Sequence, residues 1–102
     1  MIRHYKKIRL LVDSETFNRI ISGEQKTIVR EYNHYWRRKL IHPRSLDLFP
    51  NIILVFSVGF GKSIVYYAYC KGIDIKGIEE NDTLTTEFII HIGKPFDPEL
   101  LK

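Results

Sequence analysis

The run Ile52–Val58 constrains the fold of this chain more than any other segment does. It reads Ile-Ile-Leu-Val-Phe-Ser-Val, so β-branched and aliphatic residues dominate it and no residue in it is charged. A helix needs about 20 apolar residues to cross a bilayer, and this run is far shorter. A short, uninterrupted apolar run of this composition is typical of a buried strand. The sequence therefore predicts a β-sheet with residues 52–58 as its central strand.

Four further segments predict strands around this one. In Lys6–Val12, apolar residues alternate with polar ones, so that Ile8, Leu10 and Val12 share one face. Residues 59–62 predict a glycine-containing turn, and the segment after them then predicts the second strand of a hairpin. The four predicted strands are residues 6–12, 25–31, 63–75 and 87–92.

Two short helices are predicted in the first half of the chain. Asp13 supplies an N-cap, and Gly23 is placed to end the first helix. This helix carries a one-sided apolar stripe at helical spacing, formed by Phe17, Ile20 and Ile21. We therefore expect it to serve packing. The second helix is predicted over residues 32–40.

The remaining segments complete the predicted architecture. Residues 77–85 are predicted as an acidic loop, and Pro95 and Pro98 predict an irregular C-terminal tail. Five strands of unequal length with two short helices indicate an α+β fold whose sheet curls toward a small barrel. The chain has 102 residues and neither a repeat nor a linker, so one domain is expected over residues 1–102, with its core over residues 6–94.

Composition and cysteine content narrow the class of protein. Hydrophobic residues make up 44% and charged residues 27% of the chain, as in folded globular proteins. The single cysteine, Cys70, cannot form an internal disulfide and is interpreted as a small buried apolar residue. No N-terminal apolar segment resembles a signal peptide, so a cytoplasmic protein without a membrane partner is expected. The four histidines are scattered without a zinc-binding spacing, and neither a metal nor a cofactor is expected.

The net charge of +4 is unevenly distributed along the chain. Residues 1–44 carry 11 Lys and Arg against 4 Asp and Glu, a net charge of +7. Residues 45–102 carry 5 against 8, a net charge of −3. This asymmetry favours a face that meets a polyanion, because focused positive potential raises both affinity and encounter rate. The alternative is a solvated surface that is merely basic.

Residues 22–31 read Ser-Gly-Glu-Gln-Lys-Thr-Ile-Val-Arg-Glu and are followed by Tyr-Trp-Arg-Arg at residues 35–38. This pattern resembles the signature of ASCH domains, in the PUA-like superfamily, of the small single-domain bacterial or phage type. Residues 56–62 and 88–94 lie where small ASCH proteins have comparable phrases, so the resemblance covers about residues 6–94. It implies a PUA-like β-barrel of five to six strands with two short helices. It also implies a cleft between the first helix and the strand after it, and binding of RNA or a modified nucleoside.

The resemblance, together with residue chemistry, predicts nucleic-acid contacts in two places. Lys26 and Arg30 fall on one face of a strand with period two, where a guanidinium and an ammonium could hold phosphate. The alternative for this pair is surface ion pairing with Glu24 or Glu31. The second place offers aromatic rings for stacking beside positive charge, and its residues are Tyr35, Trp36, Arg37 and Arg38.

Trp36 has a second interpretation, and Lys62 adds one more predicted contact. Trp36 has an alternative role as a core anchor on a short helix. Lys62 is a further predicted contact in the glycine-containing turn. The spacing there is not that of a triphosphate-binding loop, and the turn lies between strands rather than before a helix.

Two other functions stay open. One branch of the family resembles amidohydrolases that act on N4-acetylcytidine with a Lys, a Thr and a Glu. Lys26 matches this Lys, but Val29 stands where the Thr is expected, which leaves Thr27 and Glu31 as the substitutes. The other alternative is a protein-interaction domain that uses exposed aromatic residues, which a contiguous apolar surface patch would favour.

Overall fold

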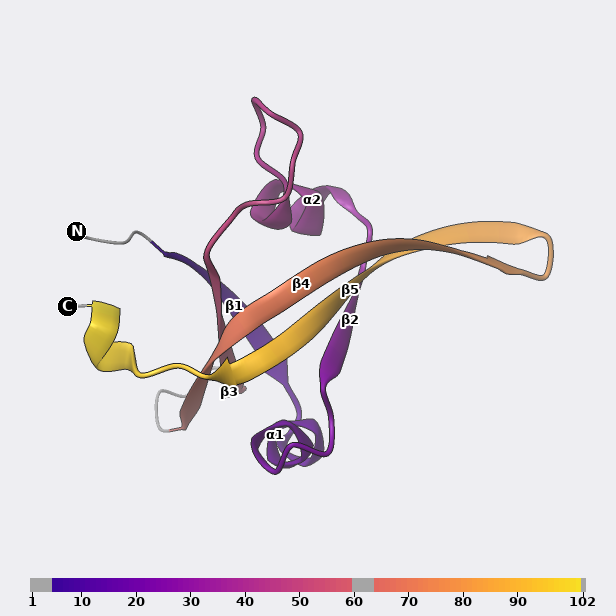
Figure 1. Ribbon diagram of the computed structural model, residues 1–102. Coiled ribbons are helices and arrows are strands. Elements are labelled where there is room, and N and C mark those ends of the chain that lie inside the picture. Colours follow the sequence, from indigo (N-terminus) through magenta and orange to yellow (C-terminus); the bar gives the residue numbers. More distant parts are fainter. Residues whose placement is uncertain (1–4, 60–63, 102) are drawn as a thin grey trace.

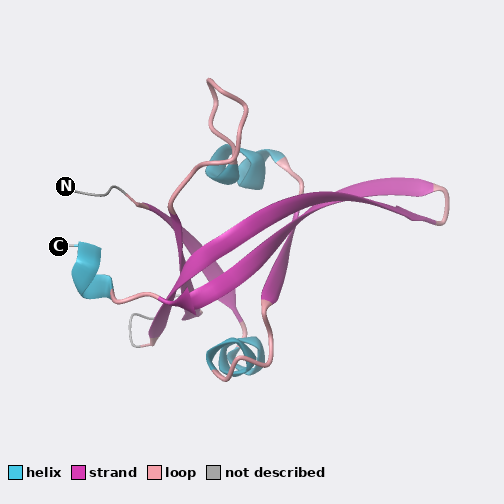
Figure 2. Cartoon of the chain, viewed as in Figure 1, coloured by secondary structure: helices cyan, strands magenta, loops and turns pink. Residues whose placement is uncertain are grey.

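The computed structural model describes residues 5–59 and 64–101 of the chain. It confirms the α+β class: five strands form one mixed sheet, accompanied by two α-helices (Figures 1 and 2). The sheet order is β1-β3-β4-β5-β2, and only β1 and β3 run parallel. The elements are β1 (Lys6–Val12), α1 (Ser14–Ile21), β2 (Thr27–Glu31), α2 (His34–Leu40), β3 (Ile52–Val58), β4 (Val65–Glu80), β5 (Thr83–Pro95) and the 3₁₀ helix η1 (Pro98–Leu101).

Strand β3 has the bounds that its apolar composition predicts. All its residues except Val58 are buried, because β1 and β4 flank it and the core covers it. It is therefore an interior strand, although the middle place in the sheet order belongs to β4. Its Ser57 hydroxyl is buried and has no hydrogen-bond partner among the described residues.

The sheet does not close into the predicted barrel. β1 and β2 are its two edges, and no backbone pairing joins them in the part of the chain that the structure describes. One side chain spans the gap instead: Nη2 of Arg30, on β2, donates to the carbonyl oxygen of Leu11, on β1, at 3.0 Å. We call this contact the Arg30 bridge. The architecture is thus an open, curled sheet whose edges are linked by a guanidinium.

The two helices lie at opposite ends of the curled sheet, with α1 below and α2 above the strands in Figure 1. Phe17 and Ile20 of α1 and Leu40 of α2 all enter one core cluster, together with Phe56 of β3 and Phe88 of β5. Burial of these side chains is the main source of stability for a fold of this size. Each helix therefore covers one end of the same core.

Both helices begin at the capping residues that their sequences favour. Asp13 accepts a hydrogen bond from the Thr16 amide at 2.7 Å, which lowers the pKa of the Asp13 carboxyl. Asn33 caps α2 in the same way, so this helix begins at His34 rather than at residue 32. Gly23 has φ +84° and follows the end of α1, as predicted. Ile21 is 50% exposed, so the buried stripe of α1 is narrower than predicted.

The predicted acidic loop over residues 77–85 is wrong. β4 continues to Glu80 and β5 begins at Thr83, with a two-residue turn between them. Asn81 and Asp82 have φ values of 51° and 61°, and two consecutive positive φ angles define a type I′ hairpin turn. Residues 74–85 form a twisted ribbon that projects from the body, at the right of Figure 1, and we call it the arm.

The C-terminal segment is more ordered than its prolines suggest. Phe96 is only 4% exposed, and its amide donates to the carbonyl of Tyr67 at 3.0 Å. Its ring makes edge contacts with Tyr5 and Tyr69, at 5.3 and 5.0 Å between centroids. The segment ends in a 3₁₀ helix, so only a short stretch around Asp97 is irregular.

Candidate functional site

A cavity of about 620 Å³ lies between the C-terminal end of α1, the segment before β2, and strands β4 and β5. This is the place where the ASCH resemblance predicts a cleft. Three lysines line it, Lys26, Lys71 and Lys94, and none of its described lining residues is acidic. Tyr66 and Tyr69 also line it. We call it the lysine cavity, since positive charge and aromatic surface distinguish it.

Two β-bulges in the β4–β5 ladder shape this cavity. The ladder pairs Ala68 with Pro95 and Cys70 with Ile92, so two residues of β5 stand against one residue of β4. The next pair joins Gly72 to His91, which leaves Lys71 as the extra residue on β4. Bulges re-aim side chains and are frequent beside functional sites. Here, the residues inside the two irregular stretches all line the cavity, and they are Tyr69, Lys71, Gly93 and Lys94.

Two of the cavity lysines have contacts within the fold that are not ion pairs. The carbonyl of Lys26 accepts a hydrogen bond from the Ile92 amide at 2.9 Å, which fixes the start of β2 against β5. Lys94 Nζ lies 5.4 Å from the centroid of the Tyr69 ring. No ion pair with a described residue neutralises any of the three ammonium groups. The alternative pairing of Lys26 with Glu24 or Glu31 is thus not formed between these residues.

Gly93 lies in the cavity wall close to the backbone of β4. A Cβ atom placed there would lie 3.0 Å from the carbonyl oxygen of Tyr69, whereas a Cβ at Gly72 would have no neighbour within 4 Å. We expect Gly93→Ala to lower the free energy of unfolding by about 1–3 kcal/mol, because the backbone of β4 must move. Gly72→Ala is the matched control and should change it by less than about 1 kcal/mol. Urea denaturation of both variants checks this, and equal stabilities would contradict it.

Arg30 does not join Lys26 in this cavity. Regular β2 begins at Thr27, so Lys26 precedes the strand and lies at its end. Arg30 is half-buried instead, and its Nη1 donates to its neighbour's carbonyl, that of Val29, at 2.9 Å. Its guanidinium carbon lies 5.6 Å from the centroid of the Trp36 ring, and burial lowers the pKa of Arg30. The structure therefore separates the predicted pair and gives Arg30 a bridging contact.

Four more of the predicted nucleic-acid residues lie on α2, at the opposite end of the molecule (Figure 1): Tyr35, Trp36, Arg37 and Arg38. Tyr35 is 57% exposed, with Lys39 Nζ 5.5 Å from its ring centroid. Trp36 packs partly against the core, which agrees with its alternative role as an anchor. Arg37 lies over the ring of Tyr32, at 5.5 Å.

Arg38 of α2 lines two further cavities, of about 340 and 640 Å³. Lys62 lies outside the described residues. The predicted contacts thus fall on two separate surfaces, of which only the lysine cavity includes Lys26.

The three residues of the amidohydrolase alternative are not brought together. Thr27 and Glu31 stand at opposite ends of β2, which at about 3.3 Å per residue places their backbones about 13 Å apart. Neither lines the lysine cavity, and Glu31 is exposed opposite Glu87. Lys26 therefore has no carboxylate or threonine beside it among the described residues of the cavity.

Sequence reasoning missed Lys71 and Lys94 as members of the site. Both are single lysines in strands, which period-two alternation places on a solvent face. A signal was nevertheless present, because each has a glycine beside it, Gly72 and Gly93 respectively. A glycine inside a strand pattern indicates a bulge.

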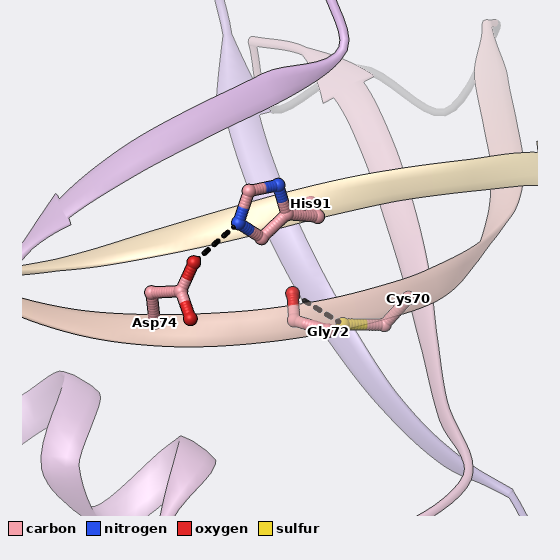
Figure 3. A network of polar contacts seen from close by, with 4 residues as sticks. All are labelled: Cys70, Gly72, Asp74 and His91. Atoms are coloured by element: carbon pink, nitrogen blue, oxygen red, sulfur yellow. Dashed lines mark hydrogen bonds and ion pairs between the residues drawn. The ribbon is translucent and has the colours of Figure 1, made fainter.

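A second group of polar side chains lies farther along β4 and β5 (Figure 3). His91 Nε2 and Asp74 Oδ2 are 2.7 Å apart, while Cys70 Sγ donates to the carbonyl of Gly72 at 3.6 Å. The hydrogen-bond partner of His91 is thus Asp74 and not the thiol. Burial raises the pKa of Cys70, so the thiol is not activated as a nucleophile.

The raised pKa of Cys70 predicts a loss of stability in alkali. The folded state holds this proton more tightly than the unfolded chain does, whose thiol titrates near about 8.5. The contribution is fully present below that pH and is lost as the pH rises through the folded-state value. We expect the urea midpoint to fall more steeply above about pH 8.5 in the wild type than in Cys70→Ala, which lacks the group. Parallel slopes for the two proteins would contradict this.

Two features are absent from the residues that the structure describes. No group of three or more His, Cys, Asp or Glu side chains is arranged to hold a metal ion. None of the described helices has the length and apolar character needed to cross a membrane.

Comparison of the chain with protein-family models, curated proteins and solved structures finds no match. The likeness to ASCH domains therefore rests on the residues quoted above.

Proposed function

We propose that this chain is an ASCH-like module that binds RNA or a nucleotide in the lysine cavity. The observation that carries the proposal is a cavity lined by three lysines, with no acidic residue in its described lining and no ion pair between these lysines and a described residue. Ammonium groups without ion-pair partners attract phosphate, and three lysines lining one concave site raise the local positive potential.

The aromatic residues and the size of the cavity fit the same ligand class. Tyr66 and Tyr69 line it, and tyrosine faces provide stacking surfaces for bases in single-stranded recognition. Its volume of about 620 Å³ falls within the range of small-molecule sites, which are about 300–1,000 Å³. A phosphate near the lysines and a base near the tyrosines together account for both kinds of lining residue.

Binding is supported better than hydrolysis. An amidohydrolase needs a base or nucleophile whose partners lie within hydrogen-bond reach. Lys26 has no such partner in the described lining, and Glu31 lies at the far end of β2. The arrangement fits an anion-holding role for Lys26.

The test is the salt dependence of binding to a short single-stranded RNA and to its constituent mononucleotides. If all three lysines neutralise phosphates, the logarithm of the association constant should fall with the logarithm of salt concentration at a slope of about −2. Fluorescence anisotropy of labelled RNA measures this slope, and competition measures the mononucleotides. Absence of binding at low salt, or binding without salt dependence, would refute the proposal.

A further inference from the structure

The arm carries an unpaired strand edge that remains unexplained by the lysine cavity. β3 pairs with β4 only as far as Tyr69. Beyond that residue, β4 pairs with β5 on one side and with no described strand on the other. A two-stranded ribbon is marginally stable in water, and an open edge is a template for another strand. The arm therefore has the geometry of a site for strand addition.

The sequence along this edge is complementary to itself when read in the opposite direction. Two copies of β4 that pair antiparallel around Ile75 place Asp74 of each copy opposite Lys76 of the other. The same register places Lys71 opposite Glu79. Two-fold symmetry makes each of these pairs occur twice, and opposite charges directly across a ladder are stabilising.

Neighbouring registers lack this complementarity. Residues directly opposite each other in an antiparallel ladder have their side chains on the same face of the sheet. When the two copies of β4 form one continuous sheet, the two-fold axis therefore passes through a pair of identical residues. The alternative registers move this axis by one residue at a time. A centre at Asp74 sets two aspartates against each other, and a centre at Lys76 sets two lysines against each other. Ile75 is thus the centre, of these three, that places unlike charges opposite each other.

The apolar residue at the centre favours the same arrangement. Ile75 is 49% exposed, although its β5 partner Phe88 is fully buried in the core. Leu84, near the tip, is 73% exposed on the same ribbon. In the symmetric pairing the two Ile75 side chains lie side by side across the ladder, which removes apolar surface from water.

We infer that the free edge of β4 in the arm binds a second copy of this chain, forming a two-fold dimer centred on Ile75. Charge complementarity along the edge selects the partner, and the pairing leaves Lys26 and Lys94 outside the contact. The dimer extends each two-stranded arm into a four-stranded ribbon. Of the three lysines that line the cavity, the pairing engages Lys71, which lies opposite Glu79 of the other copy.

Charge exchange at positions 74 and 76 tests this inference by sedimentation analysis at low salt. The wild type should show twice the 12.1 kDa mass of one chain at high protein concentration. Asp74→Lys alone and Lys76→Asp alone each place like charges opposite each other, so each should weaken self-association by about tenfold or more. An equimolar mixture of the two variants restores unlike pairs at every position and should dimerise again.

Glu80→Lys is the matched control, because this residue lies on the same strand but opposes the uncharged Cys70 in the inferred register. It should leave the association constant nearly unchanged. Asp74 also contacts His91, and Lys76 lies opposite Glu87 within the chain, so circular dichroism must show that each variant is folded. A wild type that stays monomeric at all concentrations, or a mixture that fails to dimerise, would overturn the inference.

Discussion

Replacing both Lys26 and Lys94 with alanine should weaken RNA binding by about a hundredfold at low salt. A hydrogen bond between charged groups contributes about 1.5–3 kcal/mol, so each lysine accounts for at least about tenfold. The salt slope should fall from about −2 to about −0.7, since one of three lysines remains in the cavity. Both effects follow from the loss of phosphate contacts, and anisotropy titrations at several salt concentrations measure them.

Lys7→Ala combined with Arg9→Ala is the matched control for this experiment. Both side chains are exposed on β1 and neither lines the lysine cavity. This double variant loses the same net charge, so it separates the cavity from the general basicity of the chain. If it weakened binding as much as the cavity variant, the solvated basic surface would be the better explanation.

Replacing Arg30 with alanine should destabilise the fold while leaving the lysine cavity able to bind. The change removes the Arg30 bridge to Leu11 and the contact with the Trp36 ring. We expect the free energy of unfolding to fall by about 2 kcal/mol, the value typical of a hydrogen bond to a charged group. That is a large share of the roughly 5–15 kcal/mol that stabilises a domain.

Arg38→Ala provides the comparison for Arg30→Ala. Arg38 lies exposed on α2, and a surface substitution of this kind changes stability by about 0.5 kcal/mol or less. Thermal and urea denaturation of both variants check the difference. Equal stability of the two would show that the Arg30 bridge contributes nothing, whereas a loss of RNA binding in folded Arg30→Ala would return this residue to the binding site.

The strands that the sequence predicted best have a clear pattern of buried and exposed side chains. β1 alternates between buried and exposed side chains, and β3 is buried except at Val58, so the predicted bounds of both strands are confirmed. Asp13 marked the start of α1 because an N-cap has its own local chemistry. The strands of the arm were not predicted over residues 77–85. Both faces of the arm meet solvent, so its sequence has no alternation of apolar and polar residues that would indicate a strand. Its acidic composition instead predicted a loop.

The site was predictable only where one segment carried it. Lys26 follows α1 closely in the chain, so local pattern was enough to single it out. Lys71 and Lys94 reach the same cavity from strands far along the chain, and bulges in the ladder decide where they lie. Arg30 shows the converse. A period of two predicts that Arg30 and Lys26 share one face of a strand, but the regular strand begins only at Thr27, so Lys26 lies outside it. Whether the sheet closes likewise depends on whether β1 and β2 pair with each other, and no local sequence pattern determines this.

The order of strands in the sheet also has a consequence for folding kinetics. β3, β4 and β5 follow one another as antiparallel neighbours, so their contacts close short loops of chain. β1 reaches β3 only across α1, β2 and α2, and β2 pairs with the distant β5. Contacts of high sequence separation form slowly, and we expect the three-stranded meander to form before the N-terminal segments dock. Lys26 would then join Lys71 and Lys94 in the last step, so the complete cavity exists only in the fully folded chain.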